Sequence, residues 1–185
     1  MLKILITLSL FTLNVFAENK FINNYVFEWC DKDPQSIEKY LKNSINGDKR
    51  NANAAYALGS LYLNGIGLKQ DIKKADLYIT IAANLNLPEA INSIGDGYYS
   101  GDIRHKNIKM ALEYYEKAAK MGFGPAQFNA GVVLMNSAKS KEDLEKAIFY
   151  LDKASKNRDD LNSMTESAKK YKLHAKDKLK RFNKN

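Results

Sequence analysis

The sequence predicts an all-α fold, because one pattern is written three times between Asn51 and Ser155. A period of roughly 20 to 50 residues is typical of stacked supersecondary units, none of which can bury its apolar side alone. We therefore predict an α-solenoid of about three regular 36-residue repeats, with a degenerate helix pair before them and a capping helix after them. The columns that recur every 36 residues are Gly59, Gly95 and Gly131; Ala75, Ala111 and Ala147; Tyr78, Tyr114 and Tyr150; and Ala82, Ala118 and Ala154.

Each repeat is expected to hold two helices joined by a short loop. Pro88 and Pro125 suit the first turn of a helix, where a missing N–H costs little. Gly65 and Gly101 can adopt the positive φ that often ends a helix. The first helices are expected at residues 54–64, 88–100 and 125–136.

Short polar residues mark the starts of the second helices. Asp71, Asn107 and Asp143 stand 36 residues apart and can each accept a hydrogen bond from the first turn as N-caps. Ser140 and Asp143 could instead form a capping box, which would move the third start.

The glycine column, Gly59, Gly95 and Gly131, lies inside the expected first helices. Glycine in a helix interior costs about 1 kcal/mol relative to alanine, so its use three times indicates a close helix contact. We expect the neighbours to be the small residues Ala82, Ala118 and Ala154 of the second helices.

The repeats, assigned to residues 51–158, are flanked by residues 18–50 and 159–185. The first flank is expected to form one helix from Phe21 to Trp29 and another after Asp33-Pro34, with the apolar stripe Ile37, Tyr40, Leu41 and Ile45 and a stop at Gly47. The second flank is expected to form a capping helix with a basic outer face, along the stripe Met164, Ala168, Tyr171, Ala175, Leu179 and Phe182.

Residues 1–17 have the features of a secretory signal peptide. Lys3 precedes an apolar run that is too short to span a bilayer, and Val15-Phe16-Ala17 is a small-residue cleavage pattern. We predict cleavage after Ala17 and export to the periplasm. Cys30 is the single cysteine, so it is either buried or able to pair with another chain.

The repeats resemble the Sel-one-like repeat, a relative of the tetratricopeptide repeat, over residues 51–155. The third unit departs from the pattern, with Leu134, Ser137 and Ser155 in place of a tyrosine, a glycine and an alanine. The resemblance implies a right-handed superhelix of antiparallel helix pairs whose first helices line a concave face that binds other proteins. The matching columns of the first unit are Ala54, Leu58, Gly59, Tyr62, Gly65, Gly67, Asp71, Ala75, Tyr78, Ala82 and Ala83.

Catalysis has no visible support in the sequence. The two histidines, His105 and His174, lie in no recognisable motif, and with one distant cysteine they give no metal-ligand spacing. We therefore predict no enzyme activity, no cofactor, no metal and no small-molecule substrate. The basic segment 163–185, with a net charge of +6, is expected to be a solvated helix face rather than a nucleic-acid site.

Protein binding is the predicted function, because the first helices carry residues that change from repeat to repeat and are not needed for stacking. Aromatic and methionine anchors with polar neighbours suit a protein-binding groove. A general adaptor is the first hypothesis. An immunity protein that neutralises a type VI secretion toxin such as a phospholipase is the alternative that the resemblance suggests, and binding of a membrane surface by the basic helix is a weaker one. The predicted first-helix face consists of Tyr56, Ser60, Leu63, Asn92, Asp96, Tyr99, Phe128, Val132 and Met135, although the last trio could instead be covered by the C-terminal helix.

Overall fold

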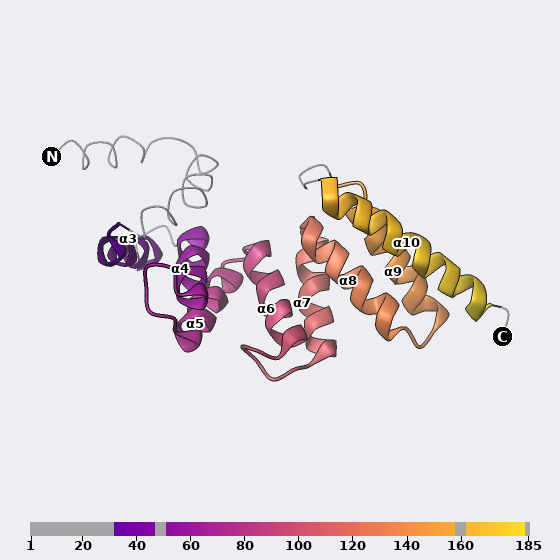
Figure 1. The fold of residues 1–185 in the computed structure, drawn as a ribbon, viewed down its shortest axis with the longest axis horizontal. Coiled ribbons are helices and arrows are strands. Elements are labelled where there is room, and N and C mark those ends of the chain that lie inside the picture. The colour runs from indigo at the N-terminus through magenta and orange to yellow at the C-terminus, as the bar shows by residue number, and fades with distance from the viewer. Residues whose placement is uncertain (1–31, 47–50, 158–161, 184–185) are drawn as a thin grey trace. The chain divides into compact units, whose positions relative to one another are not determined.

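A computed structural model describes residues 32–46, 51–157 and 162–183 of the chain. The described residues form eight helices and no strand, so the prediction of an all-α fold is confirmed (Figure 1). The expected signal peptide, the helix from Phe21 to Trp29, Cys30 and Gly47 lie outside the described residues. The helices are α3 (Pro34–Asn46), α4 (Ala52–Asn64), α5 (Ile72–Asn84), α6 (Pro88–Ser100), α7 (Ile108–Lys120), α8 (Gly124–Ser137), α9 (Lys141–Ala154) and α10 (Asn162–Phe182).

The chain divides into two compact units, residues 1–87 and 88–185. In the first unit α4 packs against both α3 and α5. The hydroxyl of Tyr62 on α4 donates a hydrogen bond of 2.5 Å to Oε1 of Glu38 on α3. A buried stripe on α3 faces this contact, formed by Ile37, Leu41 and Ile45 as predicted. Tyr40 was wrongly assigned to the stripe, because it is 38% exposed.

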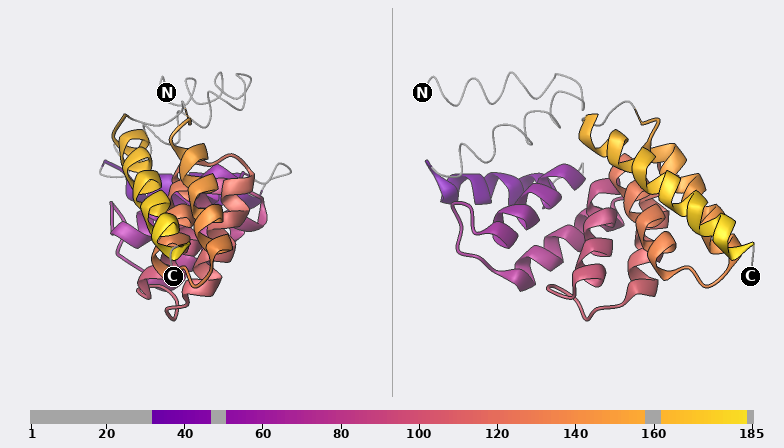
Figure 2. Two further views of the ribbon diagram at one scale, coloured as in Figure 1. Left: turned by 90° about the vertical axis from the view of Figure 1, so that its right-hand side faces the viewer. Right: turned by 45° about the vertical axis from the view of Figure 1, so that its right-hand side comes forward.

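The second unit contains α6 to α10, and each helix packs against the next. The last helix, α10, lies along α9 and also contacts α8, as Figure 2 shows from two further sides. Its buried residues are the small Ala168 and Ala175, while its basic side chains are mostly on the outside. No described helix is both long enough and apolar enough to cross a membrane.

The helix starts follow the expected caps, with one shift. The Asp71 side chain accepts a hydrogen bond from Lys74 N at 3.0 Å, and the Asn107 side chain accepts one from Met110 N at 3.1 Å. At α9 the alternative is the correct one, because Ser140 is the N-cap of a complete capping box and Asp143 occupies the third helical position.

The expected stops also hold: Gly65 and Gly101 have positive φ values of +67° and +91°.

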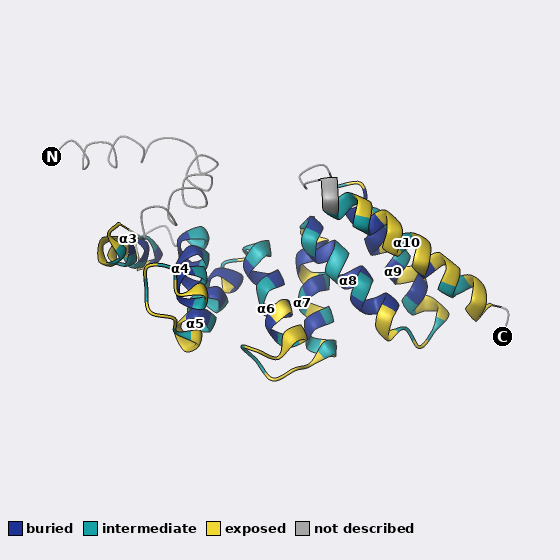
Figure 3. Ribbon diagram, in the orientation of Figure 1, coloured by how far each residue is buried: buried dark blue, intermediate teal, exposed yellow. Residues whose placement is uncertain are grey.

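The alanine columns form the core of each helix pair. All nine alanines at positions 54, 75 and 82 and their equivalents are buried, and Figure 3 shows the buried residues on the facing sides of the paired helices.

The glycine column makes the predicted close contact, but with different neighbours. A Cβ built on Gly59, Gly95 or Gly131 would lie 3.2 Å from the carbonyl oxygen of Ala75, Ala111 or Ala147, respectively. The prediction that Ala82, Ala118 and Ala154 fill this role was wrong, because the contact falls one to two turns earlier on the second helix. There the side chain directly over the glycine is Ile79, Tyr115 or Leu151.

Candidate functional site

The first-helix face falls on α4, α6 and α8, one trio of residues on each helix. On α4, Tyr56, Ser60 and Leu63 are all half-buried. The Ser60 hydroxyl donates to the carbonyl oxygen of Tyr56 at 2.9 Å, a contact within the helix. Two members of this trio, Tyr56 and Ser60, carry a hydroxyl group, and the third, Leu63, is aliphatic.

The trio on α8 lies partly under α10. Met135 is 3% exposed, and the ring of Phe128 meets that of Tyr171 edge-on, with 5.5 Å between centroids. Nζ of Lys178 donates to the Met135 carbonyl oxygen at 3.0 Å, near the end of α8. Phe128 and Met135 are thus occupied by a contact within the chain, and a partner could use them only if α10 moved.

The trio on α6 is different, because two of its members enter a polar cluster. We call Asn92, Asp96, Tyr115 and Asn129 the Asp96 cluster. Oδ1 of Asp96 accepts hydrogen bonds from the Tyr115 hydroxyl at 2.8 Å and from Asn129 Nδ2 at 3.4 Å. Its Oδ2 accepts one from Asn92 Nδ2 at 2.9 Å. Asn129 Nδ2 also donates to Asn92 Oδ1 at 3.2 Å, so the cluster joins α6, α7 and α8.

Gly95 explains how Tyr115 reaches this cluster from the second helix. The Tyr115 side chain is 2% exposed, and its ring covers Gly95, where a Cβ would lie only 2.7 Å from two ring carbons. Because glycine leaves this space open, the ring can pass between α6 and α7 and place its hydroxyl beside Asp96, the next residue. Ile79 and Leu151 hold the same place in the other repeats and carry no polar group.

Burial shapes the electrostatics of the cluster. Although Asp96 as a whole is exposed, partial burial of its carboxylate raises the pKa, and the hydrogen bond from Tyr115 opposes that shift. The pKa of Tyr115 is also raised, first by its burial and then by the bond to Asp96. No Lys or Arg in the described ranges forms an ion pair with Asp96.

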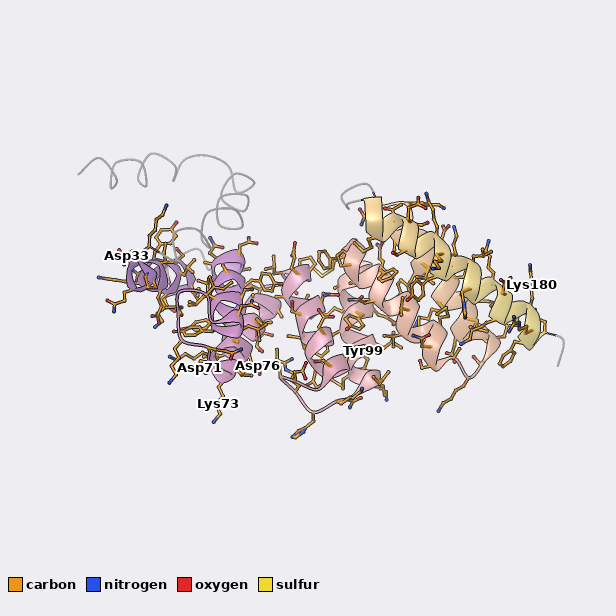
Figure 4. All side chains as sticks on the ribbon, viewed as in Figure 1. Asp33, Asp71, Lys73, Asp76, Tyr99 and Lys180 are labelled. Carbon is orange, nitrogen blue, oxygen red and sulfur yellow. The ribbon has the colours of Figure 1, made fainter. Side chains whose placement is uncertain are left out.

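Tyr99 completes the α6 trio at the edge of this cluster. It lies three residues after Asp96, so the two share one side of the helix. Tyr99 is 43% exposed, and its side chain is labelled in Figure 4. An exposed aromatic ring beside a carboxylate held by three donors is an arrangement suited to contact with another molecule.

Comparison with known families fits this architecture. The family model of the Sel1 repeat matches residues 52–87, 88–123 and 124–159, which is more than half of the chain. The chain belongs to the Sel1 repeat family. Each match spans one helix pair, so the fold is an α-solenoid of three Sel1 repeats as predicted.

Two solved structures are similar to this Sel1 repeat protein. A Sel1 repeat protein from Oxalobacter formigenes is 28% identical, with a TM-score of 0.59 over 71% of this chain and 96% of that chain. A protective antigen with an SLR fold, present in uropathogenic Escherichia coli strains, is 25% identical with a TM-score of 0.59. That match covers 64% of this chain and a quarter, 25%, of the antigen. Sel1 repeat proteins commonly mediate protein–protein interactions and are typically non-catalytic scaffolds.

Sequence reasoning named Asn92 and Asp96 but missed two members of the cluster. Tyr115 lies on a second helix, outside the predicted first-helix face, and Asn129 is one residue outside the predicted trio. A comparison of columns could have found both. Tyr115 replaces an aliphatic residue, and Asn129 stands where the earlier repeats have Ala57 and Ser93.

The described part of the chain contains no group of three or more His, Cys, Asp or Glu residues that could hold a metal ion. His105 is exposed in the loop after α6, and His174 is exposed on the outside of α10. Neither histidine has a hydrogen bond to a nucleophile within these described residues. Neither histidine therefore forms part of a recognisable catalytic group within residues 32–46, 51–157 and 162–183.

Proposed function

We propose that this Sel1 repeat protein binds another protein through the α6 part of its first-helix face together with the Asp96 cluster, and that it catalyses no reaction. The observation that carries the proposal is the Asp96 cluster. It consists of polar residues at columns where stacking imposes no fixed residue type, and it stands beside the exposed ring of Tyr99.

The contrast between columns supports this role. Several columns that pack the helix pairs hold the same residue in all three repeats, as with the buried alanines at position 75 and its equivalents. The column of Asp96 instead holds Ser60, Asp96 and Val132. Since packing does not require these differences, selection for a partner is the simplest physical reason for them.

A capture experiment tests the proposal with a matched pair of aromatic variants. The tagged mature chain is used to recover partners from an envelope extract in high salt, and each partner is then purified and its binding measured. Tyr99→Ala is expected to weaken binding at least tenfold, as for an interface anchor. Phe149→Ala is the control, because Phe149 is similarly exposed, at 52%, but lies on the second helix α9.

Equal binding by the wild type and Tyr99→Ala would contradict the proposed face. Loss of binding in Phe149→Ala alone would place the contact on the second helices. A single captured toxin that loses its activity in the complex would indicate the immunity role. Several endogenous clients would indicate an adaptor.

We also propose that the protein acts after export to the periplasm. The proposal rests on residues 1–17, with their positive start, short apolar run and small-residue cleavage pattern. Amino-terminal sequencing of the protein from a periplasmic fraction should begin at Glu18. Recovery of the chain with Met1 intact from the cytoplasm would contradict export.

A further inference from the structure

In the part of the chain that the structure describes, the carboxylate of Asp96 is held by neutral donors alone. A phenol hydroxyl and two carboxamides orient both oxygens, but none of them cancels the negative charge. The full chain has 29 Lys and Arg residues and a net charge of +8, yet none of the described ones forms an ion pair with this carboxylate. Asp152 shows the contrast, since both Lys156 and Lys172 bind it.

Packing alone does not account for the charge. The ring of Tyr115 needs the space over Gly95, and its hydroxyl needs one acceptor, which water or a neutral side chain could supply at this partly exposed edge. The repeat before it has Ser60 in the column of Asp96, and the repeat after it has Val132, each on an equivalent helix. The stack therefore accepts a small polar or an apolar residue at this column.

We propose that Asp96 receives a lysine or arginine side chain of the bound protein, with the ring of Tyr99 as the second contact for the same cation. This inference rests on the proposed function, because it names the chemistry of the partner at that face. A carboxylate fixed by hydrogen bonds makes a short, charge-assisted contact with an ammonium or guanidinium group. An exposed tyrosine ring one turn away can bind the cation through its face.

The whole-chain charge makes this proposal specific. A protein with a net charge of +8 attracts acidic ligands at long range, so non-specific binding favours Asp and Glu in a partner. Enrichment of Lys or Arg at one position of a bound peptide would therefore be the opposite of what non-specific attraction predicts. Salt near physiological strength has a screening length of about 8 Å. It therefore weakens the long-range attraction of acidic ligands but leaves a direct contact between Asp96 and a cation largely intact.

A random dodecapeptide phage library, panned at physiological salt on the immobilised mature protein, supplies a probe that needs no known partner. The same library is panned in parallel on Asp96→Asn and on Asp102→Asn. Both variants lose one negative charge, but Asp102 lies in the exposed loop after α6, outside the Asp96 cluster. Asp96→Ser, which introduces the residue of the first repeat, is the second cluster variant. Thermal unfolding checks that each variant is folded.

Wild type and Asp102→Asn are expected to select peptides with an enriched Lys or Arg at one position. Their affinity for Asp96→Asn and Asp96→Ser should fall roughly tenfold or more, as for loss of a hydrogen bond to a charged group. Equal binding of the selected peptides to wild type and Asp96→Asn would overturn the inference. The proposed function would still stand in that case if Tyr99→Ala weakened the same peptides. Failure to select any peptide would count against both.

Discussion

Two alanine substitutions in α6, placed two residues apart, should change stability in opposite directions. A Cβ on residue 95 would lie 2.7 Å from Cδ1 and Cε1 of Tyr115 and 3.2 Å from the carbonyl oxygen of Ala111. The ring cannot easily move, because it is buried between α6 and α7 and its hydroxyl is bonded to Asp96. A Cβ on residue 97 would meet nothing closer than Cβ of Ile103 at 3.6 Å, an ordinary van der Waals contact.

The magnitudes follow from these distances. Overpacking in a packed contact costs about 1–3 kcal/mol, whereas alanine in place of glycine in a helix gains about 1 kcal/mol. Gly95→Ala should therefore lower the free energy of unfolding by about 1 kcal/mol, and Gly97→Ala should raise it by up to about 1 kcal/mol. The expected difference between the two variants is about 2 kcal/mol.

Urea unfolding followed by far-ultraviolet circular dichroism measures this difference directly. Both variants add one methyl group at a buried position in the interior of the same helix, so the helix-propensity contribution is matched and only the neighbours differ. If Gly95→Ala were as stable as Gly97→Ala, the close approach of α6 and α7 at Tyr115 would not exist in solution. The physical reason given for the glycine column would then be incorrect.

Three further predictions concern the Asp96 cluster, the start of α9 and the docking of α10. The pKa of Asp96 is raised in the folded state, chiefly by burial. The contribution of Asp96 to stability is therefore full below its unfolded pKa and is lost as the pH rises through its folded pKa. Urea unfolding at several pH values from about 3.5 upward, chosen around the usual Asp pKa of about 3.9, should show wild type losing stability relative to Asp96→Asn as the pH rises. Ser140→Ala removes the N-cap of α9 and should cost about 1 kcal/mol in the same unfolding assay, with no change expected for the exposed Lys139→Ala. Tyr171→Ala removes the edge-on contact with Phe128 and should increase amide hydrogen exchange along α10 while leaving α6 unchanged.

The helix pairs could be predicted from the sequence because their signals are local. The prolines, the glycine stops and the polar caps act within one or two turns of their own position, so Asn107 and Gly101 behave as their residue types predict. The start of α9 was ambiguous for the same reason. Ser140 and Asp143 both satisfy local rules, and the reciprocal hydrogen bonds of the capping box distinguish them only in three dimensions.

The partner of each glycine could not be predicted, because it depends on how far one helix slides along the next. The sequence shows small residues at both Ala111 and Ala118, two turns apart on α7. Either could face Gly95 on grounds of size alone. The structure places Gly95 at Ala111 and Tyr115, which leaves Ala118 to pack elsewhere in the core.

The contacts of the candidate site could not be predicted either, because they also join residues from different helices. Asp96 was identified as a variable residue of the first helix, but its donors come from three helices, and only Asn92 shares its own. Tyr115 takes part both in helix packing and in the Asp96 cluster. Its ring fills the space that the glycine column provides, and its hydroxyl orients the carboxylate proposed to bind a partner. Ile79 and Leu151 can fill that space in the other repeats but cannot donate a hydrogen bond, so the second repeat alone among the three couples helix packing to a polar contact on the first-helix face. Because the Tyr115 ring packs against Gly95 and its hydroxyl binds Asp96, a change at Gly95 would also reach the proposed binding surface.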